Sequence, residues 1–137
     1  MLYNMLMNQK QALFVDDDRF LLDMYALKFA RAGYIVQTAD SGTIALKLLE
    51  EGYDPDAIMV DIAMPGMDGF EFVENIRRAK LSERAAVMML TNQTTTADVA
   101  RAKALGVDSF MFKATLIPSE VLSMVEQILL ARPRTKA

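Results

Sequence analysis

Short apolar runs alternate with longer stretches of helical periodicity along the chain. The apolar runs predict five strands, at residues 13–15, 35–39, 57–60, 86–90 and 109–112. The stretches after them predict five helices, at residues 18–33, 41–52, 70–80 and 97–105 and from 118 or 119 onward. In the first helix, the apolar positions at helical spacing are Phe20, Leu21, Met24, Tyr25 and Leu27.

Five strand–helix units in strict alternation predict an α/β fold. The near-continuous apolar character of the strands is typical of a parallel sheet that is buried on both faces. Right-handed crossovers then give a doubly wound sandwich of three layers. Such sheets bind ligands at the carboxyl ends of their strands, near the point where the strand order reverses.

Composition narrows the class of protein. A chain of 137 residues makes one domain, and no apolar run approaches the roughly 18 residues that span a bilayer. We expect a soluble cytoplasmic protein with one folded domain at 11–131, an N-terminal arm at 1–10 and a tail at 132–137. The net charge of −3 argues against direct nucleic-acid binding. The absence of Cys and His excludes thiol nucleophiles, Ser-His-Asp catalysis and the usual zinc sites.

Polar side chains follow four of the five predicted strands. Asp16 and Asp17 come after the first, Asp61 after the third, Thr91 after the fourth and Lys113 after the fifth. The carboxyl ends of parallel strands meet at one edge, so these residues predict one site. The neighbouring Asp18 is explained more simply as the cap of the next helix.

This combination of groups indicates a chemistry. Carboxylates packed closely repel one another, and a divalent cation relieves that repulsion. Oxygen-only ligands suit Mg²⁺, with Mn²⁺ as the alternative, and no EF-hand spacing favours Ca²⁺. A carboxylate beside such a cation can attack phosphorus and form an acyl phosphate. Lys113 could neutralise charge on the transferring group, and Thr91 could hydrogen-bond a phosphoryl oxygen.

From about residue 11 to 131, the chain resembles the receiver domain of two-component response regulators. The resemblance rests on Phe14-Val15-Asp16-Asp17, on the stretch VDIAMPGMDG at 60–69, on Thr91 and on Lys113. It implies a flavodoxin-like (βα)5 fold of strand order 2-1-3-4-5, like that of the chemotaxis regulator. The domain could stand alone or belong to a longer protein.

The resemblance also implies a role for each matching residue. Asp61 would be the phosphoacceptor. Asp17 and Asp61 would bind Mg²⁺ directly, together with the backbone carbonyl of Ala63, and Asp16 would act mainly through metal-bound water. Lys113 would pair with the phosphoryl group.

A conformational role is implied for two further positions. Thr91 would follow the phosphoryl group and couple it to Phe110, which occupies the aromatic switch position of the family. Phe110 could equally be a plain core residue. The face formed by the helix at 97–105, the strand at 109–112 and the last helix would then change shape.

The implied function is a phosphorylation-activated signalling switch and not an enzyme in the usual sense, since only self-catalysed phosphoryl transfer and hydrolysis are expected. The donor would be a phosphohistidine on a sensor kinase or a histidine phosphotransfer protein, because this chain has no His. A downstream protein, an output domain or a second copy of the chain would receive the signal. No membrane contact is expected.

Two positions depart from the family pattern. Ala114 follows Lys113 where receivers usually carry proline, often after a cis bond. A cis bond before a non-proline residue costs about 3 kcal/mol, so either that strain persists or the loop takes another path. Asn92 follows Thr91 where a small residue is usual, and we hypothesise that Asn92 and Ala63 alter the lifetime of the phosphoryl group.

Two alternatives remain open from the sequence. Ala114 and Asn92 are the support for a degenerate receiver that binds or dimerises without phosphorylation. A phosphatase of the haloacid-dehalogenase type is a remote alternative, based on the Asp-x-Asp pattern at 16–18. That fold needs an acidic pair after its lysine, and only Glu120 and Glu126 follow Lys113.

Overall fold

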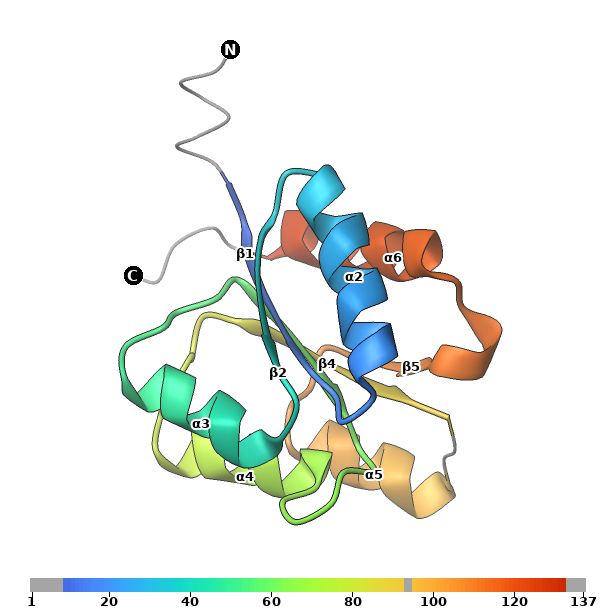
Figure 1. The fold of residues 1–137 in the computed structure, drawn as a ribbon. Coiled ribbons are helices and arrows are strands. Elements are labelled where there is room, and N and C mark those ends of the chain that lie inside the picture. Colours follow the sequence, from blue (N-terminus) through green and yellow to red (C-terminus); the bar gives the residue numbers. More distant parts are fainter. Residues whose placement is uncertain (1–8, 93–94, 133–137) are drawn as a thin grey trace.

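The computed structural model of the chain describes residues 9–92 and 95–132. Within them, strands and helices alternate as predicted, and the α/β class is confirmed (Figure 1). The elements are β1 (Gln11–Val15), α2 (Arg19–Arg31), β2 (Ile35–Ala39), α3 (Gly42–Glu50), β3 (Ala57–Asp61), α4 (Gly69–Arg78), β4 (Ala86–Thr91), α5 (Thr96–Ala104), β5 (Ser109–Phe112), the 3₁₀ turn η1 (Lys113–Thr115) and α6 (Pro118–Ala131). Most of the predicted arm and tail, residues 1–8 and 133–137, lies outside the described residues.

The five strands form one parallel sheet in the order β2-β1-β3-β4-β5, which confirms the predicted topology. The order reverses between β1 and β3, where Val15 lies opposite both Ala39 and Val60. All carboxyl ends therefore meet at one edge, and the reversal opens a crevice beside the last residues of β1 and β3.

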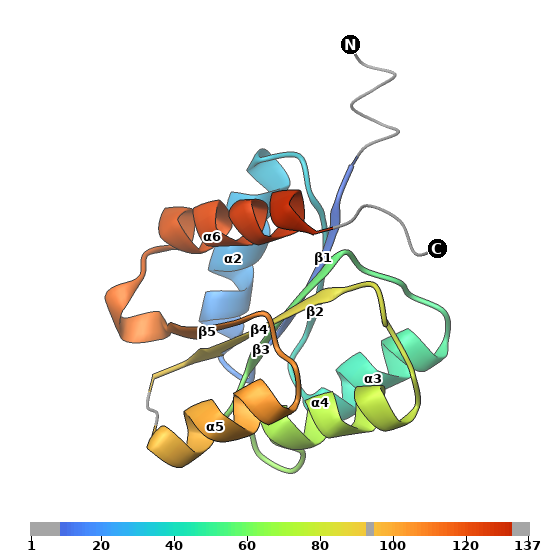
Figure 2. The ribbon, with the colours of Figure 1, turned by 180° about the vertical axis from the view of Figure 1, so that it is seen from behind.

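The helices cover both faces of the sheet. Helices α2 and α6 lie on one face, and α3, α4 and α5 lie on the other (Figures 1 and 2). On the first face, the ring of Phe14 stacks on Tyr25 with 5.0 Å between ring centroids. On the second, Phe72, Val73 and Ile76 of α4 are fully buried against the sheet. The inward positions Val73 and Ile76 that the sequence suggested for this helix are thus in the core.

Side-chain caps fix where the helices begin. Asp18 accepts hydrogen bonds from the backbone N–H groups of Phe20 and Leu21, which confirms it as the cap of α2. Asp68 forms a reciprocal capping box with Glu71 at the start of α4. Such caps satisfy backbone donors that have no partner within the helix. The start of α4 is therefore held firmly next to the loop that follows β3.

The apolar face expected for α2 is partly wrong. Phe20 and Leu27 are 71% and 54% exposed, whereas Leu22, Tyr25 and Phe29 form the buried face. Apolar residues lie on two sides of this helix, so either side could form the buried stripe, and the packing against β1 selects the side that contains Phe29.

Among the described helices, none combines the length and apolar character needed to cross a bilayer.

Candidate functional site

A hollow of about 560 Å³ lies at the carboxyl edge of the sheet. Four strand ends contribute to its wall, and so do the first turns of α2 and α5. The residues that line it are Asp16, Asp17, Asp18, Leu21, Asp61, Ile62, Ala63, Thr91, Asn92, Asp98 and Lys113. The structure thus brings together every site residue that the sequence predicted except Phe110.

Three carboxylates form the floor of the hollow. Asp16, Asp17 and Asp61 each offer an oxygen, and these oxygens lie within 4.8 Å of one another. Asp16 and Asp61 are buried at the ends of β1 and β3, whereas Asp17 is exposed. Asp16 is further fixed because its carboxylate accepts a hydrogen bond of 2.9 Å from the backbone N–H of Asp18. A cluster of carboxylate oxygens at this spacing fits a hard divalent cation such as Mg²⁺.

Lys113 supplies the positive charge of the site. Its side chain is only 7% exposed, and its amino group forms an ion pair with Asp16. The same nitrogen lies 3.4 Å from Oδ1 of Asp61. Burial alone would lower the pKa of Lys113, but the two carboxylates outweigh burial and raise it, so the amino group is charged.

The environment of Asp61 makes the ionisation of its carboxyl group unfavourable. Burial raises the pKa of Asp61 to about 6, the charge of Lys113 opposes this shift, and the negative charges of Asp16 and Asp17 add to it. A cation bound among the three carboxylates would favour the ionised, nucleophilic form. Strongly perturbed acids in a crevice are typical of functional sites.

The polypeptide after Lys113 does not follow the usual path of the family. None of the described residues follows a cis peptide bond. Instead, residues Lys113–Thr115 form the 3₁₀ turn η1, and α6 starts at Pro118. The sequence left two options at Ala114, a cis bond or another path of the loop, and the structure shows the second. Two buried carboxylates, and not a cis bond, hold the lysine side chain over the site.

The remaining predicted residues lie at different depths. Thr91 is buried at the end of β4, and Asn92 and Ala63 are exposed at the mouth of the hollow. Phe110 is half-buried on β5 and packs against the core cluster under α3 and α4, with its ring centroid 6.3 Å from that of Phe112. Phe110 is therefore not part of the wall of the hollow.

Four lining residues were not predicted as part of the site. They are Asp18, which was predicted only as a helix cap, and Leu21, Ile62 and Asp98. Asp98 forms a capping box with Thr95, which places the start of α5 at the mouth. The Thr95-x-x-Asp98 spacing is a recognisable helix-start signal and could have indicated this position from the sequence.

Comparison with known proteins gives a consistent result. The family model described as the response regulator receiver domain matches residues 12–126. The alkaline phosphatase synthesis transcriptional regulatory protein PhoP of Bacillus subtilis is 35% identical over 120 residues, which are 88% of this chain and 48% of that protein. The regulator of RpoS of Escherichia coli is 32% identical over 131 residues, covering 86% of this chain and 38% of that protein.

Solved structures agree with the sequence relatives. The chemotaxis protein CheY4 of Vibrio cholerae superimposes with a TM-score of 0.80 at 30% identity, covering 88% of this chain and 98% of that one. A response regulator from Chloroflexus aurantiacus gives a TM-score of 0.79 at 30% identity, covering 90% and 99%. The chain thus spans a whole solved domain but half or less of the curated relatives it matches.

Proposed function

The chain belongs to the family of response regulator receiver domains, and we propose that it is a signalling switch in which Asp61 accepts a phosphoryl group. The observation that carries the proposal is the position of Asp61. Its carboxylate lies at the end of β3 beside one buried lysine and two further carboxylates.

The proposed reaction is an in-line displacement on a phosphohistidine. A carboxylate oxygen of Asp61 attacks phosphorus, the new O–P bond forms as the N–P bond breaks, and the imidazole nitrogen leaves with the electron pair of that bond. The donor must come from another protein, a sensor kinase or a phosphotransfer protein, because this chain has no His. Hydrolysis of the aspartyl phosphate by water returns the switch to its starting state.

A divalent cation fits the donor set of the site. Asp17 and Asp61 would bind Mg²⁺, or Mn²⁺ in its place, directly, and Asp16 would act mainly through metal-bound water. The backbone carbonyl of Ala63, a residue that lines the same hollow, would be a further ligand. The cation supplies neutralising charge for the phosphoryl oxygens.

Two side chains of the protein complete the site. We expect Lys113 to exchange its contact with Asp16 for a charge-assisted hydrogen bond to the phosphoryl group. Thr91 lines the same hollow, and we expect its hydroxyl to bond another phosphoryl oxygen.

The output is proposed to be a population shift of the surface formed by α5, β5 and α6. A phosphoryl group adds charge and strong acceptors, and movement of Thr91 toward it leaves space that Phe110 can enter. Moving an equilibrium from 1:99 to 99:1 takes about 5.5 kcal/mol of differential stabilisation.

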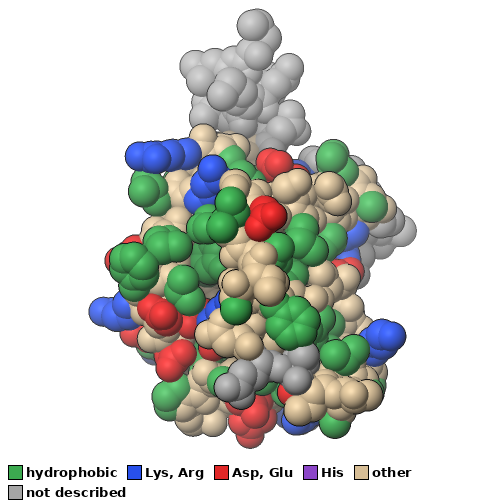
Figure 3. Space-filling view, turned by 90° about the vertical axis from the view of Figure 1, so that its right-hand side faces the viewer, with side chains coloured by type: hydrophobic (Ala, Val, Ile, Leu, Met, Phe, Trp, Pro, Cys, Tyr) green, Lys and Arg blue, Asp and Glu red, His purple; other side chains and the backbone are tan. Residues whose placement is uncertain are grey.

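The region around β5 and the start of α6 carries exposed apolar side chains, among them Phe112 and Ile117. Hydrophobic patches are visible on the side of the molecule that bears η1 (Figure 3). A downstream protein, an output domain or a second copy of the chain could bind there.

Transfer from a radiolabelled phosphohistidine protein tests this function. With Mg²⁺ present, we expect label to move to the wild type and to Asp40→Asn, which changes an acid outside the hollow, but not to Asp61→Asn. Chelation of the metal should stop the transfer. Label on Asp61→Asn would show that another residue is the acceptor, and a folded wild type that accepts no label would favour the degenerate binding module.

A further inference from the structure

Helix α5 has the least apolar anchoring of the helices described. Ala102 is its single fully buried residue, whereas α4 buries five residues and α2 and α3 bury three each. Alanine burial stabilises little, because the buried apolar area is small. The position of α5 therefore depends on polar contacts more than that of the other helices.

Two arginines make these contacts, one from each of two neighbouring helices. Arg77 of α4 donates from Nε to the carbonyl of Leu105 at 3.0 Å and from Nη2 to the carbonyl of Gly106 at 3.2 Å, where α5 ends. Arg101 of α5 pairs with Glu74 of α4 at 2.8 Å. We call this set of contacts the α4–α5 clamp, and the two helices lie side by side in both ribbon views (Figures 1 and 2).

The clamp also reaches an aromatic ring at the start of α4. The guanidinium of Arg101 lies 4.6 Å from the centroid of Phe70, a distance at which a cation and an aromatic face attract each other. Phe70 itself is buried, with 2% of its surface exposed. Arg101 is thus held over a fixed ring and not only by a surface ion pair.

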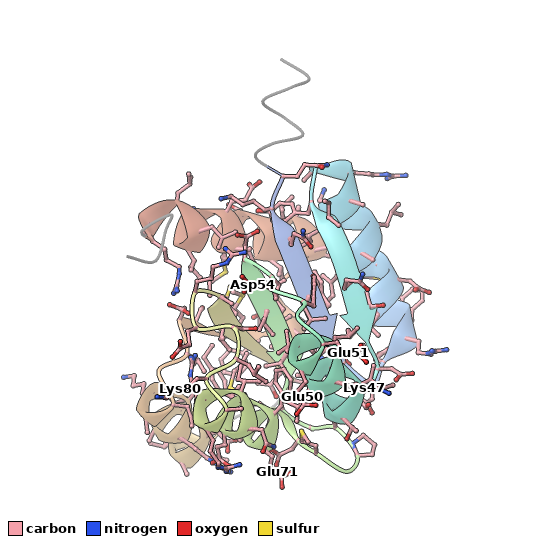
Figure 4. All side chains as sticks on the ribbon, turned by 90° about the vertical axis from the view of Figure 1, so that its left-hand side faces the viewer. Lys47, Glu50, Glu51, Asp54, Glu71 and Lys80 are labelled. Carbon is pink, nitrogen blue, oxygen red and sulfur yellow. The ribbon has the colours of Figure 1, made fainter. Side chains whose placement is uncertain are left out.

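The start of α4 is in turn joined to the phosphoacceptor. The backbone N–H of Gly69 bonds the carbonyl of Ile62 at 2.8 Å, and a Cβ at Gly69 would lie 2.3 Å from the carbonyl oxygen of Asp61. Figure 4 shows α4 with Glu71 near its start and Lys80 beyond its end. A continuous set of contacts therefore runs from the backbone of Asp61 through Gly69 and Phe70 to Arg101.

We propose that the α4–α5 clamp holds α5 in its unphosphorylated position, and that Arg77 and Arg101 are positioning residues that set how readily Asp61 is phosphorylated. The inference rests on the proposed function. If clamp contacts are stronger before phosphorylation than after it, then by thermodynamic reciprocity their loss must favour the phosphorylated state. The arginines act through α5 and do not touch the phosphoryl group.

The test compares clamp variants with matched controls. Arg101→Ala and Arg77→Ala remove the clamp contacts, whereas Arg78→Ala on α4 and Lys103→Ala on α5 remove nearby exposed cations outside it. With acetyl phosphate at limiting concentration and Mg²⁺, we expect both clamp variants to reach a higher phosphorylated-to-free ratio than wild type, by about fivefold. Arg101→Lys, which keeps a cation for Glu74 and Phe70, should return the ratio most of the way to wild type.

A second readout needs no phosphorylation. Amide hydrogen exchange in α5 should accelerate in Arg101→Ala and Arg77→Ala, while exchange in α3 stays as in wild type. Clamp variants with the phosphorylation ratio of the controls, or with unchanged exchange in α5, would overturn the inference while leaving the proposed function intact. A wild type that takes up no phosphoryl group would overturn the proposed function, and with it the regulatory part of the inference.

Discussion

Lys113 and Asp61 show how the environment of single residues prepares the site. Lys113 lies between two buried carboxylates, which hold its charged amino group at the place where a phosphoryl group would bind. Asp61 is in the opposite situation to Lys113. Burial makes the negative charge of Asp61 unfavourable when no cation is bound. The site is therefore built at the expense of stability, as is common for functional sites.

Asp61→Asn should stabilise the metal-free protein at neutral pH. The pKa of Asp61 is raised from 3.8 to about 6, mainly by burial, so the native state binds its proton more tightly than the unfolded state does. Wild-type stability should accordingly fall, relative to Asp61→Asn, as pH rises from about 4 to about 6, by about 3 kcal/mol. Urea unfolding of both proteins in a chelator, at pH 4 and pH 7.5, measures this difference. A gap in unfolding free energy that is the same at both pH values would contradict the account.

Asn92 is the residue through which the lifetime of the phosphoryl group is expected to differ from that of a typical receiver. It is exposed at the mouth of the hollow, where its amide can obstruct a water molecule or bond the phosphoryl group. We expect the Asn92→Ala variant to lose its phosphoryl group several-fold faster than wild type. This change is smaller than the roughly 10²-fold in rate that a single positioned group can contribute. Dephosphorylation followed after removal of acetyl phosphate checks this, and equal rates for the two proteins would rule the role out.

At the scale of elements, the junction of β3 with α4 is the most constrained part of the fold. Gly69 begins α4 at a point where the helix touches the backbone of Asp61 and Ile62. The Asp68–Glu71 capping box fixes the same turn from outside. Loop and helix start are therefore one rigid unit, which keeps the phosphoacceptor in place.

Gly69→Ala should be strongly destabilising. Its Cβ would meet the carbonyl oxygen of Asp61 at 2.3 Å and Cα of Ile62 at 2.9 Å, and backbone atoms cannot rotate away. We expect a loss of about 3 kcal/mol of unfolding free energy together with slower phosphorylation. Gly42→Ala is the matched control, because the three atoms nearest its Cβ belong to the side chain of Met67, at 3.0 to 3.2 Å, and not to the backbone. We expect a change below about 1 kcal/mol. Similar values for both variants in urea unfolding would contradict this explanation.

At the scale of the whole molecule, the edge of the sheet opposite the site is held by ion pairs. Arg84 pairs with Asp56 at 2.6 Å and with Asp54 at 2.9 Å, and Asp56 also accepts the backbone N–H of Gln11 at 2.7 Å. Arg132, at the end of α6, pairs with Asp108 and donates to the carbonyl of Arg84. This network joins β1, β3, β4, β5 and α6, far from the reactive carboxylates.

Arg84→Ala should cost stability without affecting the chemistry. Burial alone would raise the pKa of Asp56, but the backbone N–H of Gln11 and the guanidinium of Arg84 outweigh burial and lower the pKa. The stability that ionised Asp56 contributes is therefore present above about pH 4 and is lost as the pH falls below that value. Loss of Arg84 leaves Asp56 partly buried without its ion-pair partner at 2.6 Å, at a cost of about 2 kcal/mol at pH 7. Arg19→Ala removes an exposed pair with Asp40 and should change stability by less than about 0.5 kcal/mol. Equal unfolding free energies for the two variants would contradict this assignment.

Much of the fold follows from the sequence because its signals are local. Strand and helix positions come from hydrophobic period, and helix ends come from residues such as Asp18 and Gly33. The set of polar residues at the strand ends was predictable for the same reason, since parallel strands bring their carboxyl ends together. The buried stripe of α2 was not, because Phe20 and Phe29 are both compatible with a helix and only packing against β1 distinguishes them. The α4–α5 clamp was not predictable either, because it depends on how two helices lie beside one another. Asp98 is a different case, since its capping spacing with Thr95 is a local signal in the sequence.

The most direct test of Asp61 as the phosphoacceptor is the intact mass of the protein after incubation with acetyl phosphate, with and without Mg²⁺. We expect a gain of one phosphoryl group in wild type with Mg²⁺, and no gain in Asp61→Asn or in the presence of a chelator. A folded wild type that gains no mass, or an Asp61→Asn variant that gains as much as wild type, would contradict the claim that Asp61 is the phosphoacceptor.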